Sequence, residues 1–250
     1  MAPIATSPVR QQQQQQGGGG KAIRQGTREA LYQEATQAFL TCDYVTTHEA
    51  LNKLLAMIPP AMGTRAPWFE ASRTTNAAEW NNEKWTSKII KLAITSSAAL
   101  CKAKPPSQKA VEKLLDTSPP ITATWALQRG LELCQSQYDA VDRLDNIPAT
   151  MMVTLLMNAL KLGPEGVSRA KTIVEDWLAQ LPQAAFDAFQ VRIGPEGARE
   201  DYLRVVDLYV GEILAREEEW EMASIFLETE PIMSSKRKEV SLIFEGGNPS

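Results

Sequence analysis

The chain has 250 residues, 44% of them hydrophobic, which is enough to bury a sizeable core. Its net charge of −4, without a basic stripe carrying interleaved aromatic residues, excludes a protein that binds nucleic-acid phosphates through clustered Lys and Arg. The odd number and wide spacing of Cys42, Cys101 and Cys134 exclude a disulfide framework and a CxxC zinc site.

Residues 1–26 are predicted to form a flexible arm, because the run Gln11–Gln16 followed by Gly17–Gly20 cannot bury enough apolar surface to offset the entropy of ordering. The chain shows no secretory signal, and no apolar run reaches the roughly 20 residues of a membrane-spanning helix. As it stands, the sequence predicts a soluble cytosolic chain with one α-helical domain over 27–245 and a disordered end over 246–250.

From Thr27 onward the apolar residues recur with the period of an α-helix, and no comparable run alternates as a strand would. Thr27 and Ser107 are expected N-caps, and pairs of prolines are expected to end helices. The predicted helices are 27–40, 47–57, 78–101, 108–115, 123–135, 149–161, 165–181, 184–191, 198–216, 218–227 and 234–244. Short connections indicate an all-α fold in which antiparallel helix pairs stack as a tetratricopeptide-like array.

A faint internal repeat is consistent with this stacking. The motif Gly163-Pro164-Glu165-Gly166 recurs at 194–197, about one two-helix repeat further along the chain. In each copy the glycine suits the end of one helix and the proline suits the first turn of the next.

Two segments are candidate protein-binding sites. A long internal loop is predicted over 59–76, and it contains Trp68 and Phe69, which either fold back onto the core or form an exposed aromatic anchor for a partner. The acidic run Glu217, Glu218 and Glu219 lies between two predicted helices. This run is either a solvated helix start or a docking patch for a basic surface.

The sequence offers little catalytic chemistry. His48 is the only histidine and lies at a predicted helix start, and the chain lacks a GxSxG nucleophile motif and a glycine-rich phosphate loop. One histidine also excludes metal sites built on several histidines. The sequence therefore predicts a protein without catalytic residues, metal or cofactor.

Two stretches carry a family resemblance. The first is Tyr32–Thr41, leading into Glu49-Ala50-Leu51. The second runs over 205–227, with Leu208-Tyr209, Glu219-Trp220 and Phe226-Leu227 in order, and closes with the basic residues near 236–239. Together they resemble the fungal peroxin-26 (peroxin-15-like) family over most of 27–244, with the specific matches in the C-terminal part.

This resemblance implies a role for the chain. Family members are tail-anchored in the peroxisomal membrane, and their cytosolic helical domain recruits a AAA ATPase that extracts ubiquitinated import receptors. The resemblance thus implies a non-enzymatic adaptor on the cytosolic face of the peroxisome, with this ATPase as its partner. The family's membrane anchor lies beyond the last helical pair, so this chain, which stops at Ser250, would reach the membrane only through an anchor that it lacks.

Two alternatives stay open. The first is a generic tetratricopeptide-like scaffold that binds an extended peptide in a polar groove, for which Lys88 and Lys91 are the chief candidate residues. The second, from a different class, is an enzyme or ligand carrier in a helical bundle. A carrier needs an apolar cavity, and an enzyme needs converging polar groups, which a chain with one histidine is poorly equipped to supply.

Overall fold

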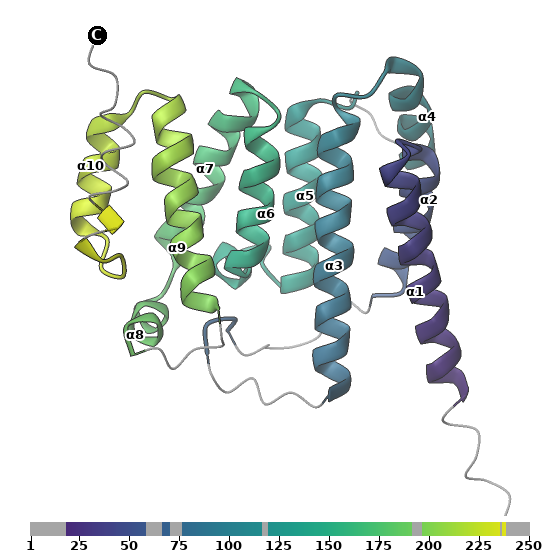
Figure 1. Cartoon of the computed structure of the whole chain (residues 1–250), viewed down its shortest axis with the longest axis horizontal. Coiled ribbons are helices and arrows are strands. Elements are labelled where there is room, and N and C mark those ends of the chain that lie inside the picture. Colours follow the sequence, from purple (N-terminus) through teal and green to yellow (C-terminus); the bar gives the residue numbers. More distant parts are fainter. Residues whose placement is uncertain are drawn as a thin grey trace, which may run out of the picture.

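The computed structural model describes residues 19–58, 67–70, 77–116, 120–191, 197–235 and 237–238. These residues form helices and short connections, and no strand occurs among them, so the prediction of an all-α fold is confirmed. The helices stand side by side in a row, with successive long helices pointing in opposite directions (Figure 1). Of the predicted loop 59–76, only residues 67–70 are described. The predicted end 246–250 lies outside the described residues.

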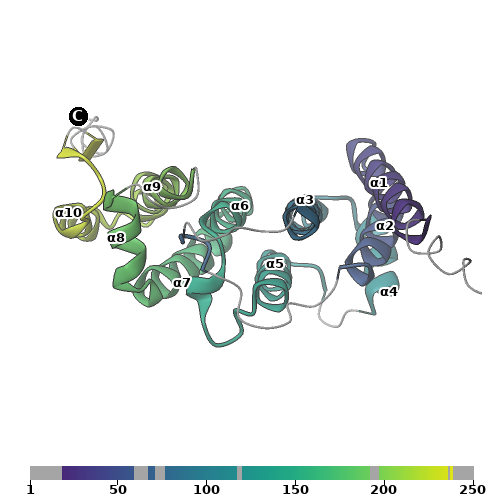
Figure 2. The same ribbon diagram turned by 90° about the horizontal axis from the view of Figure 1, so that it is seen from below.

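The row has two layers, which separate in the view from below (Figure 2). One layer contains α1 (Gly19–Leu40), α3 (Ala77–Leu100), α6 (Ala149–Leu160) and α9 (Ala198–Leu208). The other contains α2 (Tyr44–Ala56), α4 (Pro105–Leu115), α5 (Ala123–Tyr138) and α7 (Pro164–Gln180), and α10 (Trp220–Thr229) stands beside α9 at the end of the row. The short helix α8 (Gln183–Val191) lies at the lower edge in Figure 1. Contacts join each layer to the other, because α3 packs on α5 and α6 packs on α7.

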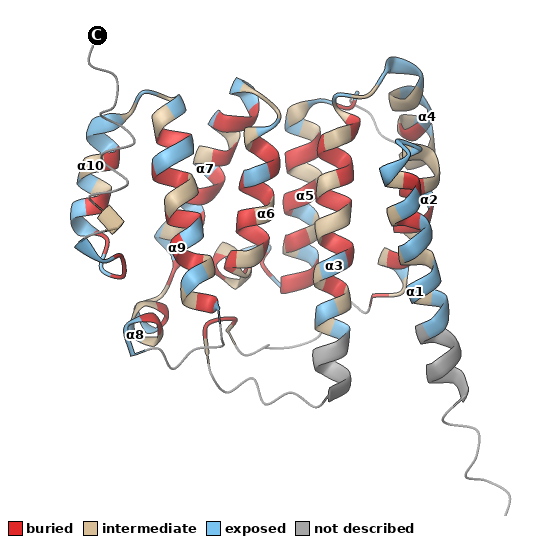
Figure 3. Cartoon of the chain, in the orientation of Figure 1, coloured by how far each residue is buried: buried red, intermediate tan, exposed pale blue. Residues whose placement is uncertain are grey.

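Buried residues occur along the whole row, on helices of both layers (Figure 3). Leu155 of α6, Trp177 of α7 and Val206 of α9 belong to the largest apolar cluster. A smaller cluster joins α1, α2 and α3, and Leu133 of α5 packs against both clusters. Each large aliphatic side chain buried there contributes roughly 1.5–3 kcal/mol relative to exposure.

Local capping explains several helix starts. The Asp43 carboxylate accepts a hydrogen bond from the Thr46 backbone N–H at 3.1 Å, so α2 begins at Tyr44 rather than at Thr47. The predictions for α4 were wrong: Ser107 is not its cap, and the two prolines that were expected to stop the preceding helix form its first turn after Lys104. Proline is well tolerated there because the first turn leaves its backbone N–H groups without partners anyway.

Helix α1 begins at Gly19, inside the segment predicted to be a flexible arm, and it passes through Thr27 without a cap. The prediction for 19–26 was therefore wrong, whereas residues 1–18 lie outside the described residues. The physical reason is cooperativity. Once packing has formed the later turns, each added residue gains a backbone hydrogen bond without a new nucleation cost.

The two copies of the glycine–proline motif are not structurally equivalent. In the first copy, Gly163 has a left-handed φ of 86° and Pro164 is the first residue of α7. The last glycine, Gly166, lies so close to α6 that an added Cβ would be 2.4 Å from the Ala159 carbonyl oxygen. In the second copy, residues 194–196 lie outside the described residues, and α9 begins only after Gly197.

The predicted helix 198–216 changes its hydrogen-bonding pattern part-way, since Tyr209–Leu214 forms a π-helical segment after α9. The Tyr209 hydroxyl donates a hydrogen bond to the Glu175 carboxylate of α7 at 2.9 Å, and its ring contacts Phe226 of α10 edge-on. Burial raises the pKa of Tyr209, and the bond to Glu175 adds to this effect. The segment therefore links three helices through one side chain.

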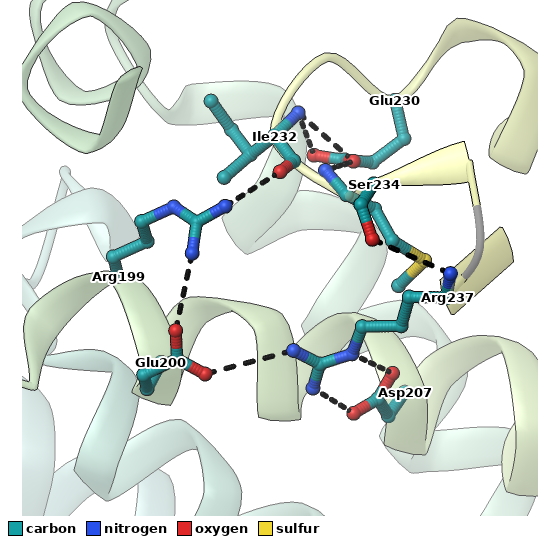
Figure 4. A network of polar contacts seen from close by, with 8 residues as sticks. Arg199, Glu200, Asp207, Glu230, Ile232, Ser234 and Arg237 are labelled. Atoms are coloured by element: carbon teal, nitrogen blue, oxygen red, sulfur yellow. Dashed lines mark hydrogen bonds and ion pairs between the residues drawn. The ribbon is translucent and has the colours of Figure 1, made fainter. Parts of the chain in front are cut away.

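A polar network fastens the chain after α10 onto α9 (Figure 4). Arg199 donates a hydrogen bond to the Ile232 carbonyl at 3.0 Å, and Arg237 forms an ion pair with Asp207. Ser234 accepts from the Arg237 backbone N–H, as an N-cap does. The rest of the helix predicted over 234–244 lies almost entirely outside the described residues.

Candidate protein-binding site

The turn Pro67–Glu70 carries Trp68 and Phe69 into the interior. Trp68 is only 5% exposed and Phe69 is also buried. The Trp68 Nε1–H donates a hydrogen bond to the Asp145 carbonyl at 2.9 Å, and the indole stacks on Trp177 with ring centroids 5.9 Å apart. Of the two alternatives for this pair, the structure shows the fold back onto the core, and the exposed anchor is wrong. The reason is that a large apolar ring whose N–H is paired is more stable when buried.

A hollow of about 560 Å³ opens beside this turn. Its walls are the turn itself, the connection 139–146 between α5 and α6, and the first residues of α8. It lies near the lower ends of α5 and α6 in Figure 1. Its volume is in the range of protein sites that hold small molecules or a few side chains of a partner.

Hydrogen bonds hold the connection 139–146 in shape. Asp139 ends α5 in a left-handed conformation, and its carbonyl accepts a hydrogen bond from the Asn146 side-chain amide at 2.8 Å. The Arg143 guanidinium binds both oxygens of the buried Asp145 carboxylate, at 3.2 and 2.6 Å. This bidentate hydrogen bonding raises the pKa of Arg143. The connection 139–146 is thus a preorganised wall of the hollow.

The hollow carries an excess of negative charge. Four acidic residues are among those that line it, Glu70, Asp139, Asp142 and the buried Asp145, against one basic residue, Arg143, whose guanidinium Asp145 already binds. Within the described part of the chain, no ion pair involves Glu70, Asp139 or Asp142. Sequence reasoning missed these residues, although three aspartates in one short helix connection were a visible signal.

The acidic run Glu217–Glu219 forms the connection between the π-helical segment and α10, at the upper end of the array in Figure 1. The Glu219 carboxylate accepts hydrogen bonds from Lys171 of α7 at 2.5 and 2.6 Å, which raise the pKa of that lysine. Glu218 is exposed and left-handed, with a φ of 60°. One of the three carboxylates, that of Glu219, is therefore already bound to a lysine of the same chain. The structure does not bring the acidic run together with Trp68.

Replacing Glu218 by glycine is expected to stabilise the protein by about 1 kcal/mol, because glycine adopts a left-handed φ without the steric cost of a Cβ. Thermal unfolding of the purified protein checks this. The matched control is Glu217→Gly, which removes the same charge at a neighbour without a left-handed φ and is expected to destabilise. Equal effects of the two changes would contradict the prediction.

His48 lies on the inner face of α2 and is 3% exposed. Its Nε2 atom is buried without a hydrogen-bond partner in the part of the chain that the structure describes. Burial lowers the pKa of His48 to about 4, and the neighbouring Arg129 guanidinium contributes to the shift. The imidazole is therefore neutral at pH 7.

This burial predicts a pH dependence. Between pH 6.5, the usual pKa of histidine, and the folded pKa of about 4, the unfolded chain binds a proton that the folded chain excludes. The stabilisation is therefore complete above pH 6.5 and is lost as the pH falls towards 4. From pH 7 to pH 5, the unfolding free energy should fall about 2 kcal/mol further in wild type than in His48→Gln. Urea denaturation of both proteins at both pH values measures this difference. If the unfolding free energy fell equally in wild type and in His48→Gln, the side chain of His48 would be accessible to solvent in the folded protein.

Comparison with protein-family models, with curated proteins and with solved structures finds no match to this chain. In the described ranges, no helix is both long enough and apolar enough to cross a membrane, and no three His, Cys, Asp or Glu side chains gather as metal ligands would.

Proposed function

We propose that this chain is a non-enzymatic adaptor that holds a partner protein on the surface of its helical array. The observation that carries the proposal is the two-layer row of antiparallel helix pairs, since such stacking presents a long, continuous surface for binding. Apolar side chains on α10 add to this surface, because Trp220, Met222 and Ile225 are all substantially exposed.

The partner in this proposal is the AAA ATPase of the peroxisomal receptor-export machinery, which the resemblance to the peroxin-26 family implies. In that role the chain would position the ATPase, and the ATPase would perform the nucleotide chemistry. The place of action would be the cytosolic face of the peroxisome.

Affinity capture from fungal lysate with ATP present tests this proposal, with the full chain as bait and mass spectrometry as the readout. Enrichment of the ATPase pair, lost when unlabelled chain competes, is the expected result. The peroxisomal role is wrong if no ATPase is captured with ATP, with ADP or without nucleotide. The generic tetratricopeptide-like scaffold would then be the function to pursue.

A further inference from the structure

The hollow beside Pro67–Glu70 is lined by both apolar and acidic residues. Trp68, Phe69 and Tyr138 are among them, and these rings are buried in the core and cannot swing out without breaking their packing. The Val141 side chain, which also lines the hollow, is 69% exposed. Such a surface contacts apolar groups of an occupant without having to rearrange.

The charge of the hollow indicates the charge of its occupant. A negatively charged segment would be repelled by the acidic residues Glu70, Asp139 and Asp142. A neutral segment would remove water from them and supply donors, but not the positive charge that offsets the cost of desolvating a carboxylate. A lysine or arginine side chain supplies both a positive charge and hydrogen-bond donors. The stem of either side chain also packs against apolar surface such as Val141.

We propose that the hollow binds a segment of a partner protein that places a lysine or arginine beside an apolar residue. The basic group lies among Glu70, Asp139 and Asp142, and the apolar residue packs on Val141 and the aromatic residues that line the hollow. Asp145 takes no direct part, because Arg143 occupies both of its oxygens. This inference rests on the proposed adaptor function and names the chemistry of its partner.

A charge-neutralising variant tests the inference without disturbing the fold. Glu70→Gln, Asp139→Asn and Asp142→Asn keep the side-chain shapes and break no ion pair among the described residues. Asparagine also tolerates the left-handed φ of 52° at position 139. The control neutralises three exposed residues at the far end of the array, by Glu218→Gln, Glu221→Gln and Glu228→Gln. Circular dichroism spectra and melting temperatures equal to those of wild type verify that both variant proteins are folded.

The experiment selects binders to the full wild-type chain from a library of random dodecapeptides, then measures affinity by fluorescence anisotropy. We expect enriched peptides to carry Lys or Arg beside an apolar residue. Their affinity should fall at least about tenfold in the hollow variant, stay unchanged in the control variant, and weaken with added salt. Enrichment of acidic or neutral peptides, basic peptides that bind the hollow variant equally well, or no enrichment at all would each overturn the inference.

Affinity capture with the same two variants separates this inference from the proposed function. If wild type and hollow variant capture the ATPase equally, the adaptor function stands and the assignment of the hollow is wrong. If no bait captures the ATPase while basic peptides still bind the hollow, the peroxisomal role fails and the hollow remains a site for basic segments.

Discussion

Replacing Trp68 by alanine is expected to lower the free energy of unfolding by about 3–5 kcal/mol, the range for truncating a large buried aromatic side chain. The indole is buried against Trp177 and Phe189, so its removal leaves a cavity that the rigid neighbours cannot fill. Its loss also leaves the Asp145 carbonyl without the hydrogen bond from Nε1. An exposed anchor would instead give a change within about 0.5 kcal/mol.

Urea denaturation of wild type and variant measures the effect, and Trp220→Ala is the matched control. Trp220 is 43% exposed on α10, so its truncation is expected to cost much less than that of Trp68. If the two substitutions had equal and small effects, the turn Pro67–Glu70 would not be packed onto the core in solution. The hollow would then lose one of its walls.

Replacing Glu230 by alanine is expected to lower the free energy of unfolding by about 3–4 kcal/mol, because buried donors would lose their acceptor. Glu230 is 4% exposed, and its carboxylate accepts a hydrogen bond from the Tyr202 hydroxyl at 3.0 Å. It also accepts from the backbone N–H of Ile232, likewise at 3.0 Å. Desolvation, together with this carboxylate, raises the pKa of Tyr202, so the phenol keeps its proton and remains a donor.

Thermal and urea unfolding of Glu230→Ala, beside Glu228→Ala, check this prediction. Glu228 lies on the same helix but is exposed, so its removal is expected to change stability by less than about 0.5 kcal/mol. Tyr202→Phe should fall between them, at about 1–2 kcal/mol, since it removes one hydrogen bond to a charged group. Equal stability of the two alanine variants would mean that Glu230 is solvated and the chain after α10 is detached from α9.

Much of the helix pattern is readable without the fold. The predicted helices 78–101, 149–161 and 165–181 lie within one residue of α3, α6 and α7 at each end. The reason is that an amphipathic stripe is a local property, written in residues three and four apart.

Two predictions of helix starts were wrong because neither residue type nor composition fixes where a helix begins. Pro105 is as compatible with ending one helix as with starting the next, and only the path of the chain decides between them. Likewise, the start of α1 at Gly19 depends on helix propagation, which composition does not reveal.

The sequence by itself determined the all-α class and the antiparallel order of the helices, because these follow from local periodicity and short connections. Only the tertiary structure decided that Trp68 is buried and that Glu70 and Asp142 line one hollow. The burial of a side chain and the charge of a surface depend on segments far apart in the chain. Packing against α7 and α8, rather than any local pattern, brings those segments together.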